Sequence, residues 1–238
     1  MYGYIRLSIT FLLTSFFLLG FSDKNVRGVI VQGFTAKSGN KYKFYMLGNN
    51  HINFSVNRPS KQDENIQLCI AAAFTKDQQV DGIHAVNGRI FNDNKINHSV
   101  GGALVISNGK VRFINTKKGK IFSGAYVKKL SKSKSSFFQQ LYVIVNGKPE
   151  VSKSKKVFQC RGIARLKTGE ICVAESEKAI TLQTFANDLG EKVQELIYTD
   201  MGSWDEGWYK DEKGNSHKMG SIFFDTDKQT NWIYFSKK

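Results

Sequence analysis

The sequence contains few of the residues that cross-link or interrupt small folds. Its 238 residues include only two prolines, three cysteines and four histidines. No two cysteines have the spacing of metal ligands, so a zinc-binding module is not expected. There is no low-complexity tract and no clear internal repeat, which argues against long linkers and solenoids. A chain of this length can instead build one sizeable hydrophobic core, and a single domain is the prediction.

The three cysteines are an awkward number for a disulfide framework. Cys69 and Cys172 lie in apolar, strand-like runs, and Cys160 directly precedes Arg161. We expect them to be small buried hydrophobic residues. One disulfide is the alternative, because an exported protein can form one.

The first 22 residues differ from the rest. Arg6 gives a positive start, the stretch 9–21 is mostly apolar, and Gly20 and Ser22 are small residues of the kind a signal peptidase reads. The apolar run is shorter than the ~20 residues of a comfortable membrane span. We predict an export signal at 1–22, a folded domain at 23–238, and a secreted or periplasmic location. An uncleaved N-terminal anchor is the alternative and the only membrane attachment expected.

The net charge of +15 comes mostly from lysine. Such a field attracts anionic partners, which include nucleic acid, anionic glycan and membranes. The alternative is that the lysines solvate loops. The sequence shows no basic helix and no interleaving of aromatic and basic residues, so a nucleic-acid partner is not expected. We expect an anionic sugar or glycan; the pattern does not indicate an oligomeric state.

Strand-type residues dominate the chain. Apolar or alternating runs predict strands at 27–35, 41–47, 66–74, 82–87, 101–107, 110–114, 137–145, 157–166, 170–174 and 193–198. A closing hairpin is predicted from 221–225 and 232–235, and the Lys/Ser/Gly-rich stretch 115–136 is predicted to be loop. The best helix is 181–189, capped by Thr181 and stopped by Gly190. The predicted fold class is α+β: a mixed, largely antiparallel sheet core with few helices, in a single domain.

Two of these strands end or break at residues suited to chemistry. Asp200 follows the strand at 193–198 and precedes Gly202, so a carboxylate would be delivered into a tight turn. Arg161 lies in an apolar strand, where an unpaired guanidinium costs several kcal/mol, on the order of other buried ions. Its partner is either a protein carboxylate or a substrate phosphate. Asp200 has an equally plain alternative role as a turn cap.

A third strand ends at Asn87 and Gly88. This pair tolerates positive φ, so the backbone can turn sharply and present its amides to a ligand. The alternative is an ordinary hairpin turn, the commonest use of Asn-Gly.

The order of the motifs resembles the phosphodiester glycosidase family over roughly residues 65–209. The matching pieces are Asn-Gly-Arg-Ile-Phe at 87–91, Ser-Asn-Gly-Lys at 107–110, Arg-Gly-Ile-Ala at 161–164, Lys-Thr-Gly at 167–169, the helix from Thr181, and Tyr-Thr-Asp-Met-Gly at 198–202. Arg89 replaces the second glycine of the first motif. Met201 and Trp204 stand where the family has glycine and glycine or serine, which suggests a distinct substrate or altered activity.

The resemblance implies hydrolysis of a sugar-1-phosphodiester without a cofactor or metal. By that resemblance Arg161 holds the phosphate, Asp200 acts as base or nucleophile at the anomeric carbon, and Asn87 orients the substrate. The remaining substrate-binding residues are then Gly88, Thr181, Gly202, Trp204, Asp205 and Glu206. Among these, Trp204 would stack on a sugar ring, and Asp205 or Glu206 would supply a second carboxylate.

Two other functions fit parts of the pattern. A non-enzymatic envelope protein of the same fold that binds anionic glycan is favoured by Arg89, Met201 and the lysine content. A Ca²⁺-dependent module would use Asp200, Asp205, Glu206, Asp211 and Asn215, although their spacing fits no standard calcium loop.

Overall fold

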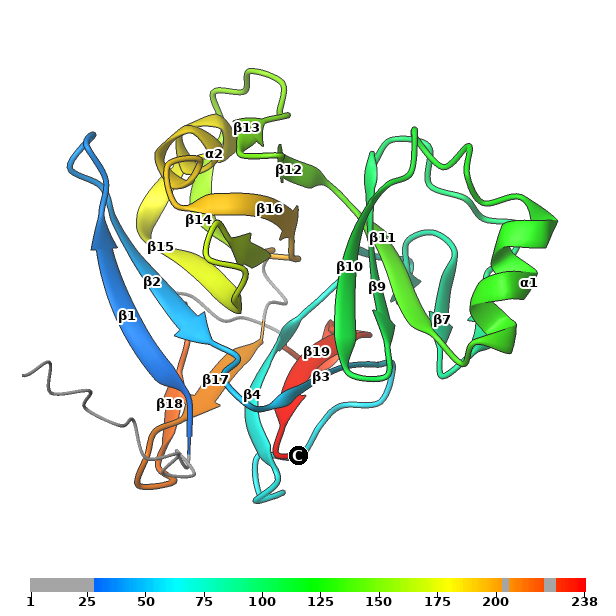
Figure 1. Cartoon of the computed structure of the whole chain (residues 1–238), viewed down its shortest axis with the longest axis horizontal. Helices are drawn as coiled ribbons and strands as arrows, with labels where there is room; N and C mark the ends of the chain where they lie inside the picture. The colour runs from blue at the N-terminus through cyan, green and yellow to red at the C-terminus, as the bar shows by residue number, and fades with distance from the viewer. Residues whose placement is uncertain (1–27, 203–205, 221–225) are drawn as a thin grey trace, which may run out of the picture.

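The computed structural model describes residues 28–202, 206–220 and 226–238. In these ranges the strands form three main sheets and a two-stranded ribbon, and all their pairings are antiparallel (Figure 1). Two α-helices pack on the sheets. The predicted sheet-rich core with few helices is therefore confirmed.

The largest sheet has seven strands in the order β1-β2-β15-β14-β16-β12-β13. Their bounds are β1 Ile30–Thr35, β2 Lys41–Met46, β15 Ile171–Thr181, β14 Val157–Leu166, β16 Val193–Tyr198, β12 Tyr142–Val145 and β13 Lys148–Pro149. Its centre is the long β14–β15 hairpin, which turns at Gly169 with φ +98°. This is the hairpin that the sequence predicts around 167–169. Strand β14 has the predicted bounds, and β15 continues beyond the predicted end at residue 174 to Thr181.

The second sheet has five strands in the order β10-β9-β11-β7-β8. Their bounds are β10 Lys110–Asn115, β9 Gly102–Ser107, β11 Ser136–Gln140, β7 His84–Val86 and β8 Arg89–Phe91. The β9–β10 hairpin turns at Asn108 and Gly109, with φ of 51° and 70°. Positive φ at both positions is what a type I′ turn requires, as predicted from Asn-Gly.

The third sheet has five strands in the order β18-β17-β4-β19-β3. Their bounds are β18 Ser216–Lys218, β17 Gly207–Lys210, β4 Ile66–Ala71, β19 Trp232–Ser236 and β3 His51–Ser55; the ribbon pairs β5 Thr75–Lys76 with β6 Gln79–Val80. A short 3₁₀ helix, η1, covers Thr226–Lys228. Residues 221–225 of the predicted closing hairpin lie outside the described residues, and β19 pairs with β3 and β4.

The predicted helix is confirmed as α2, Leu182–Leu189. The Thr181 hydroxyl accepts the Thr184 amide, so one free N–H of the first turn is satisfied. Phe185, Ala186 and Leu189 are buried, and they pack in a hydrophobic cluster with residues of β12, β14 and β16. Helix α2 thus covers one face of the seven-stranded sheet.

The prediction of loop throughout 115–136 is wrong, because helix α1 spans Gly124–Lys132. Ser123 caps it by accepting the Tyr126 amide, and Leu130 is its one fully buried residue. Such a narrow apolar stripe, surrounded by lysines, gives little of the periodic signal from which an amphipathic helix is recognised. The helix packs on the second sheet, which contains β9 and β11, at the outer edge of the molecule in Figure 1.

Two further expectations have clear outcomes. The apolar stretch 137–145 divides into β11 and β12, which belong to different sheets. All three cysteines are buried and none is in a disulfide bond, as expected for small hydrophobic residues.

Gly162 is the glycine on which the central sheet depends most. A methyl group there would lie 2.6 Å from the Ile197 carbonyl oxygen, in the backbone of the neighbouring strand. We expect Gly162→Ala to lower the free energy of unfolding by about 3 kcal/mol, since the backbone cannot yield without breaking strand pairing. Gly101→Ala is the control, because a methyl there meets nothing within 4 Å. Urea unfolding of both variants tests this, and equal midpoints would contradict it.

Candidate active site

Asp200 lies directly after β16, where three segments meet. Its amide donates to the Ala72 carbonyl at 2.9 Å, which ties it to the chain after β4. Its carboxylate accepts the Thr75 amide at 3.3 Å and the Gly202 amide at 3.2 Å. Burial raises the pKa of the Asp200 carboxyl above its ordinary value, while the two amide hydrogen bonds act in the opposite direction. The result is a half-buried carboxylate that two backbone donors hold in place.

The segment opposite Asp200 is fixed by a buried asparagine that sequence reasoning missed. Asn231 accepts the Ala73 amide at 2.7 Å and donates to the Ala73 carbonyl at 3.1 Å. The hydroxyls of Thr75 and Thr230 are 2.9 Å apart. A lone asparagine before an apolar strand carries no distinctive signal, so only the structure reveals this role.

Arg161 is completely buried and bonded to a protein carboxylate. Its Nε donates to Glu175 Oε2 at 2.6 Å, and its Nη2 lies 2.6 Å from the same oxygen. The other oxygen of Glu175 accepts the Gly220 amide at 3.2 Å and the Tyr45 hydroxyl at 3.4 Å. Of the two partners that the sequence allows for Arg161, the protein carboxylate is therefore present. Gly207 permits the guanidinium to lie close to the backbone, because a methyl there would be 2.9 Å from both terminal nitrogens.

The backbone of Arg161, in the middle of β14, lies beside the chain that follows β16, but the Arg161 and Asp200 side chains turn to different layers. The Thr199 amide donates to the Arg161 carbonyl at 3.0 Å. Alternate residues of a strand face opposite sides, so Arg161 shares a face with Ile163, which belongs to the core between the sheets. Tyr198 and Met201, on either side of Asp200, pack in the cluster that includes α2. The predicted proximity holds for the backbone, whereas the guanidinium is inside the core.

Asn87 is not brought to this place. With Gly88 it forms the turn of the β7–β8 hairpin, at φ of 48° and 84°. Its amide donates to the Ser136 hydroxyl at 2.9 Å, and a methyl on Gly88 would lie 2.5 Å from the Ser131 carbonyl oxygen of α1. In Figure 1, β7 lies beyond β9 and β11 as seen from β16. The plain hairpin turn is thus what the Asn-Gly pair forms.

Two of the other expected substrate-binding residues are used in local structure. Thr181 caps α2, so its hydroxyl accepts a helix amide. Gly202 donates its amide to Asp200 and is exposed, which places it at the rim of the site. Trp204 and Asp205 lie outside the described residues.

Glu206 is close to the site along the chain, but its carboxylate faces another cluster. It accepts the Trp232 indole N–H at 3.2 Å and pairs with Arg58 at 3.3 Å and Lys61 at 3.8 Å. Its side chain is 11% exposed. We interpret Glu206 as a group that fixes the third sheet and not as a second reactive carboxylate.

The residues of the calcium hypothesis do not assemble in the described ranges. The Asp211 carboxylate is occupied by its own turn, with the Lys213 and Asn215 amides and the His217 ring as partners. The hydrogen bond from His217 is the main reason why the pKa of Asp211 is lowered. Within residues 28–202, 206–220 and 226–238, no group of three or more His, Cys, Asp or Glu side chains is arranged to hold a metal ion.

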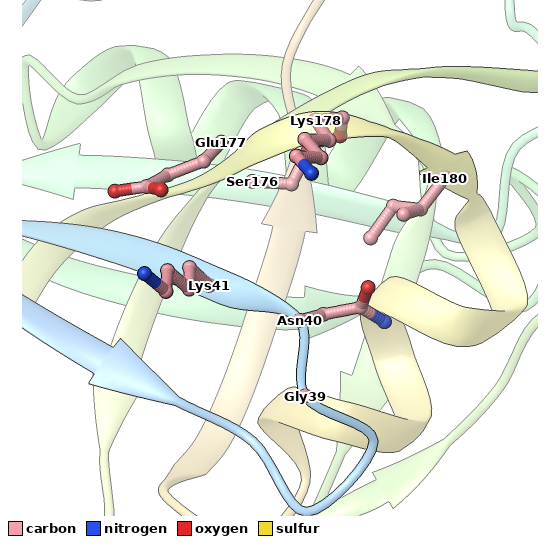
Figure 2. A pocket seen from close by; sticks show the side chains of 7 residues that line it. All are labelled: Gly39, Asn40, Lys41, Ser176, Glu177, Lys178 and Ile180. Carbon is pink, nitrogen blue, oxygen red and sulfur yellow. The ribbon is translucent and has the colours of Figure 1, made fainter.

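A cavity of about 190 Å³ lies elsewhere, between β2 and β15. The two strands pair up to Tyr42 and Ser176 and then separate. Figure 2 shows Lys41 on one side of the gap, with Glu177 and Lys178 on the other. None of the predicted site residues lines it, so this cavity is separate from Asp200.

Neither a known family model nor a curated protein matches the sequence. Several solved structures match the fold, among them the following two. The catalytic domain of zebrafish N-acetylglucosamine-1-phosphodiester alpha-N-acetylglucosaminidase, auto-inhibited by its pro-peptide, matches with a TM-score of 0.54 and 10% identity, covering 89% of this chain and 82% of that one. A hypothetical protein from Synechocystis matches with a TM-score of 0.59 and 10% identity, covering 88% of this chain and 62% of that one. The chain therefore has a distant similarity of fold to a phosphodiester glycosidase catalytic domain.

Proposed function

We propose that the chain hydrolyses a sugar-1-phosphodiester. The observation that carries the proposal is the Asp200 carboxylate, held at a strand end by two backbone amides. The similarity of fold to a domain whose name states this activity supports it. The order of motifs from 87 to 202 supports it as well.

In the proposed reaction Asp200 acts at the anomeric carbon, either as base towards water or as nucleophile. The bond between that carbon and the bridging oxygen breaks. Water supplies the new hydroxyl of the sugar, and the other product is a phosphomonoester. Because a phosphomonoester is a weakly basic leaving group, little acid assistance is needed. A carboxylate whose pKa is raised is a stronger base than an ordinary one, which suits Asp200 for this role.

Arg161 has a different proposed role from the one implied by the resemblance. Its buried pair with Glu175 leaves it as a positioning residue, whose carbonyl accepts the Thr199 amide next to Asp200. Trp204 and Asp205, just beyond Asp200 in the sequence, are proposed to stack on the sugar and to supply a second carboxylate. We further propose that residues 1–22 are an export signal and that residues 23–238 form one domain. This domain would act as a secreted or periplasmic protein.

The pH dependence of hydrolysis tests the role of Asp200. If the ionised carboxylate is required, kcat/KM should rise with pH through the pKa of Asp200, which lies above the ordinary value of 3.8. Above that pKa the rate should level off. The measurement is a pH–rate profile with a chromogenic sugar-1-phosphodiester. A wild-type profile without this limb, or a variant Asp200→Asn that retains it, would exclude the assignment.

A second function is favoured by one observation. Arg161 is buried and paired with Glu175, so its guanidinium already has an anionic partner within the protein. A protein of the same fold that binds anionic glycan without turnover would tolerate this. Glycan binding by isothermal titration, with no product released, would decide for that function.

A further inference from the structure

One stretch of the chain carries lysine without acidic residues. Between residues 94 and 149 the sequence has no aspartate or glutamate, but eleven lysines and arginines. Seven exposed lysines lie on α1 or in the loops on either side of it: Lys117, Lys118, Lys120, Lys128, Lys129, Lys132 and Lys134. We call this set the lysine face. No ion pair joins any of the seven to an acidic residue in the part of the chain that the structure describes.

Helix α1 separates its charged and apolar sides. Leu130 is buried in the cluster with Phe122 and Phe137, while Lys128, Lys129 and Lys132 are exposed. The helix is roughly 14 Å long, and the loop with Lys117 to Lys120 lies before its capped end. Figure 1 shows α1 at the outer edge of the molecule, and its three lysines are exposed.

At three of these positions the backbone conformation disfavours lysine. Lys117, Lys118 and Lys134 have φ of 49°, 54° and 49°, in the left-handed region. Asparagine or glycine adopts this conformation at lower cost than lysine. The choice of lysine is therefore explained better by its charge than by the turn.

The composition of the lysine face selects the kind of partner. On α1 and in the stretch 117–134 every basic residue is lysine, whereas arginine is the residue suited to forked recognition of single phosphates. The aromatic residues of this stretch, Phe122 and Tyr126, pack inward, so there is no platform for stacking bases or sugar rings. No helix in residues 28–202, 206–220 or 226–238 is long and apolar enough to cross a membrane. The exposed lysines themselves favour electrostatic adsorption to a surface with many negative charges.

We propose that the lysine face binds the surface of a bilayer that contains anionic phospholipids. Each lysine near such a surface adds attraction that salt screens. The chain would be held with α1 against the headgroups, and no side chain of the lysine face would enter the hydrocarbon region. This binding does not depend on the proposed hydrolysis, and Asp200 has no part in it.

The test is sedimentation of the full chain with vesicles of equal parts phosphatidylcholine and phosphatidylglycerol, and with phosphatidylcholine alone. The variant Lys128→Ala/Lys129→Ala/Lys132→Ala removes three charges and retains good helix formers. At about fivefold per lysine, it should bind the anionic vesicles on the order of 100-fold more weakly. The matched control is Lys153→Ala/Lys155→Ala/Lys156→Ala, which removes the same charge from another exposed stretch and should bind nearly as wild type.

Using full-length chains throughout gives every variant the same N-terminal segment. Equal losses in the two triple variants would overturn the proposal, because net charge alone would then explain binding. Equal binding of the wild type to both kinds of vesicle would overturn it too. So would binding of soluble polyphosphate through the lysine face without any binding to anionic vesicles.

Discussion

Glu175→Ala is expected to lower the free energy of unfolding by about 3–5 kcal/mol, the range for removing one partner of a buried ion pair. Arg161 is fully buried and Glu175 has a side-chain exposure of 5%. With Glu175 gone, the guanidinium would remain in the core without the carboxylate that lies 2.6 Å from it. The Tyr45 hydroxyl and the Gly220 amide would lose an acceptor as well. Urea unfolding followed by circular dichroism measures the change.

Glu177→Ala is the matched control, since this exposed glutamate lies two residues further along the same strand. It should change stability by less than about 0.5 kcal/mol. The double variant Arg161→Leu/Glu175→Leu should recover much of the loss, because it removes both charges and leaves apolar volume. If Glu175→Ala is no more harmful than Glu177→Ala, the buried pair does not stabilise the fold.

Asp200→Asn is expected to lower kcat/KM on a sugar-1-phosphodiester by about 10³–10⁴-fold, which is the upper part of the range for a positioned general base. The fold should survive. Because the pKa of Asp200 is raised in the folded state, ionising its carboxyl lowers the free energy of unfolding as the pH rises from the ordinary pKa of the group through its folded-state pKa. The side-chain amide of the asparagine variant does not ionise and has no such cost. Against this, the amide can accept only one of the two backbone donors. We therefore expect the unfolding free energy at neutral pH to change by less than about 1 kcal/mol.

Asp211→Asn makes the same chemical change at another carboxylate that accepts backbone amides. It should leave the turnover of the phosphodiester unchanged. Equal rates for wild type and Asp200→Asn would remove Asp200 from the reaction. A loss of the folded circular dichroism spectrum would show that the carboxylate is structural.

The sequence predicted the local elements with strong patterns. The β9–β10 and β14–β15 hairpins and helix α2 follow from Asn-Gly and Lys-Thr-Gly turns, and from a cap with a clear apolar stripe. Helix α1 was missed because three of its nine residues are lysines and only Leu130 is fully buried. A helix of that kind is stabilised by its packing on the sheet, which the sequence alone does not show.

The candidate site was harder to predict, because its residues are joined by topology. Asp200 could be singled out as a charge after an apolar strand and Arg161 as a charge within one, and the two strands do pair. Asn87 has equally good local chemistry, yet its hairpin belongs to a different sheet. The groups that do meet Asp200 are the Ala72 carbonyl and the Thr75 and Gly202 amides. Backbone groups have no sequence signature, so no motif could point to them.

The most direct measurement is hydrolysis of a sugar-1-phosphodiester in ¹⁸O-labelled water, followed by ³¹P NMR of the released phosphomonoester. Attack at the anomeric carbon, directed by Asp200, predicts a phosphomonoester that carries no label, and no release by Asp200→Asn. Label in the phosphomonoester would show that the phosphorus–oxygen bond breaks instead. A wild-type chain that binds the diester and leaves it intact would contradict the proposed hydrolysis altogether.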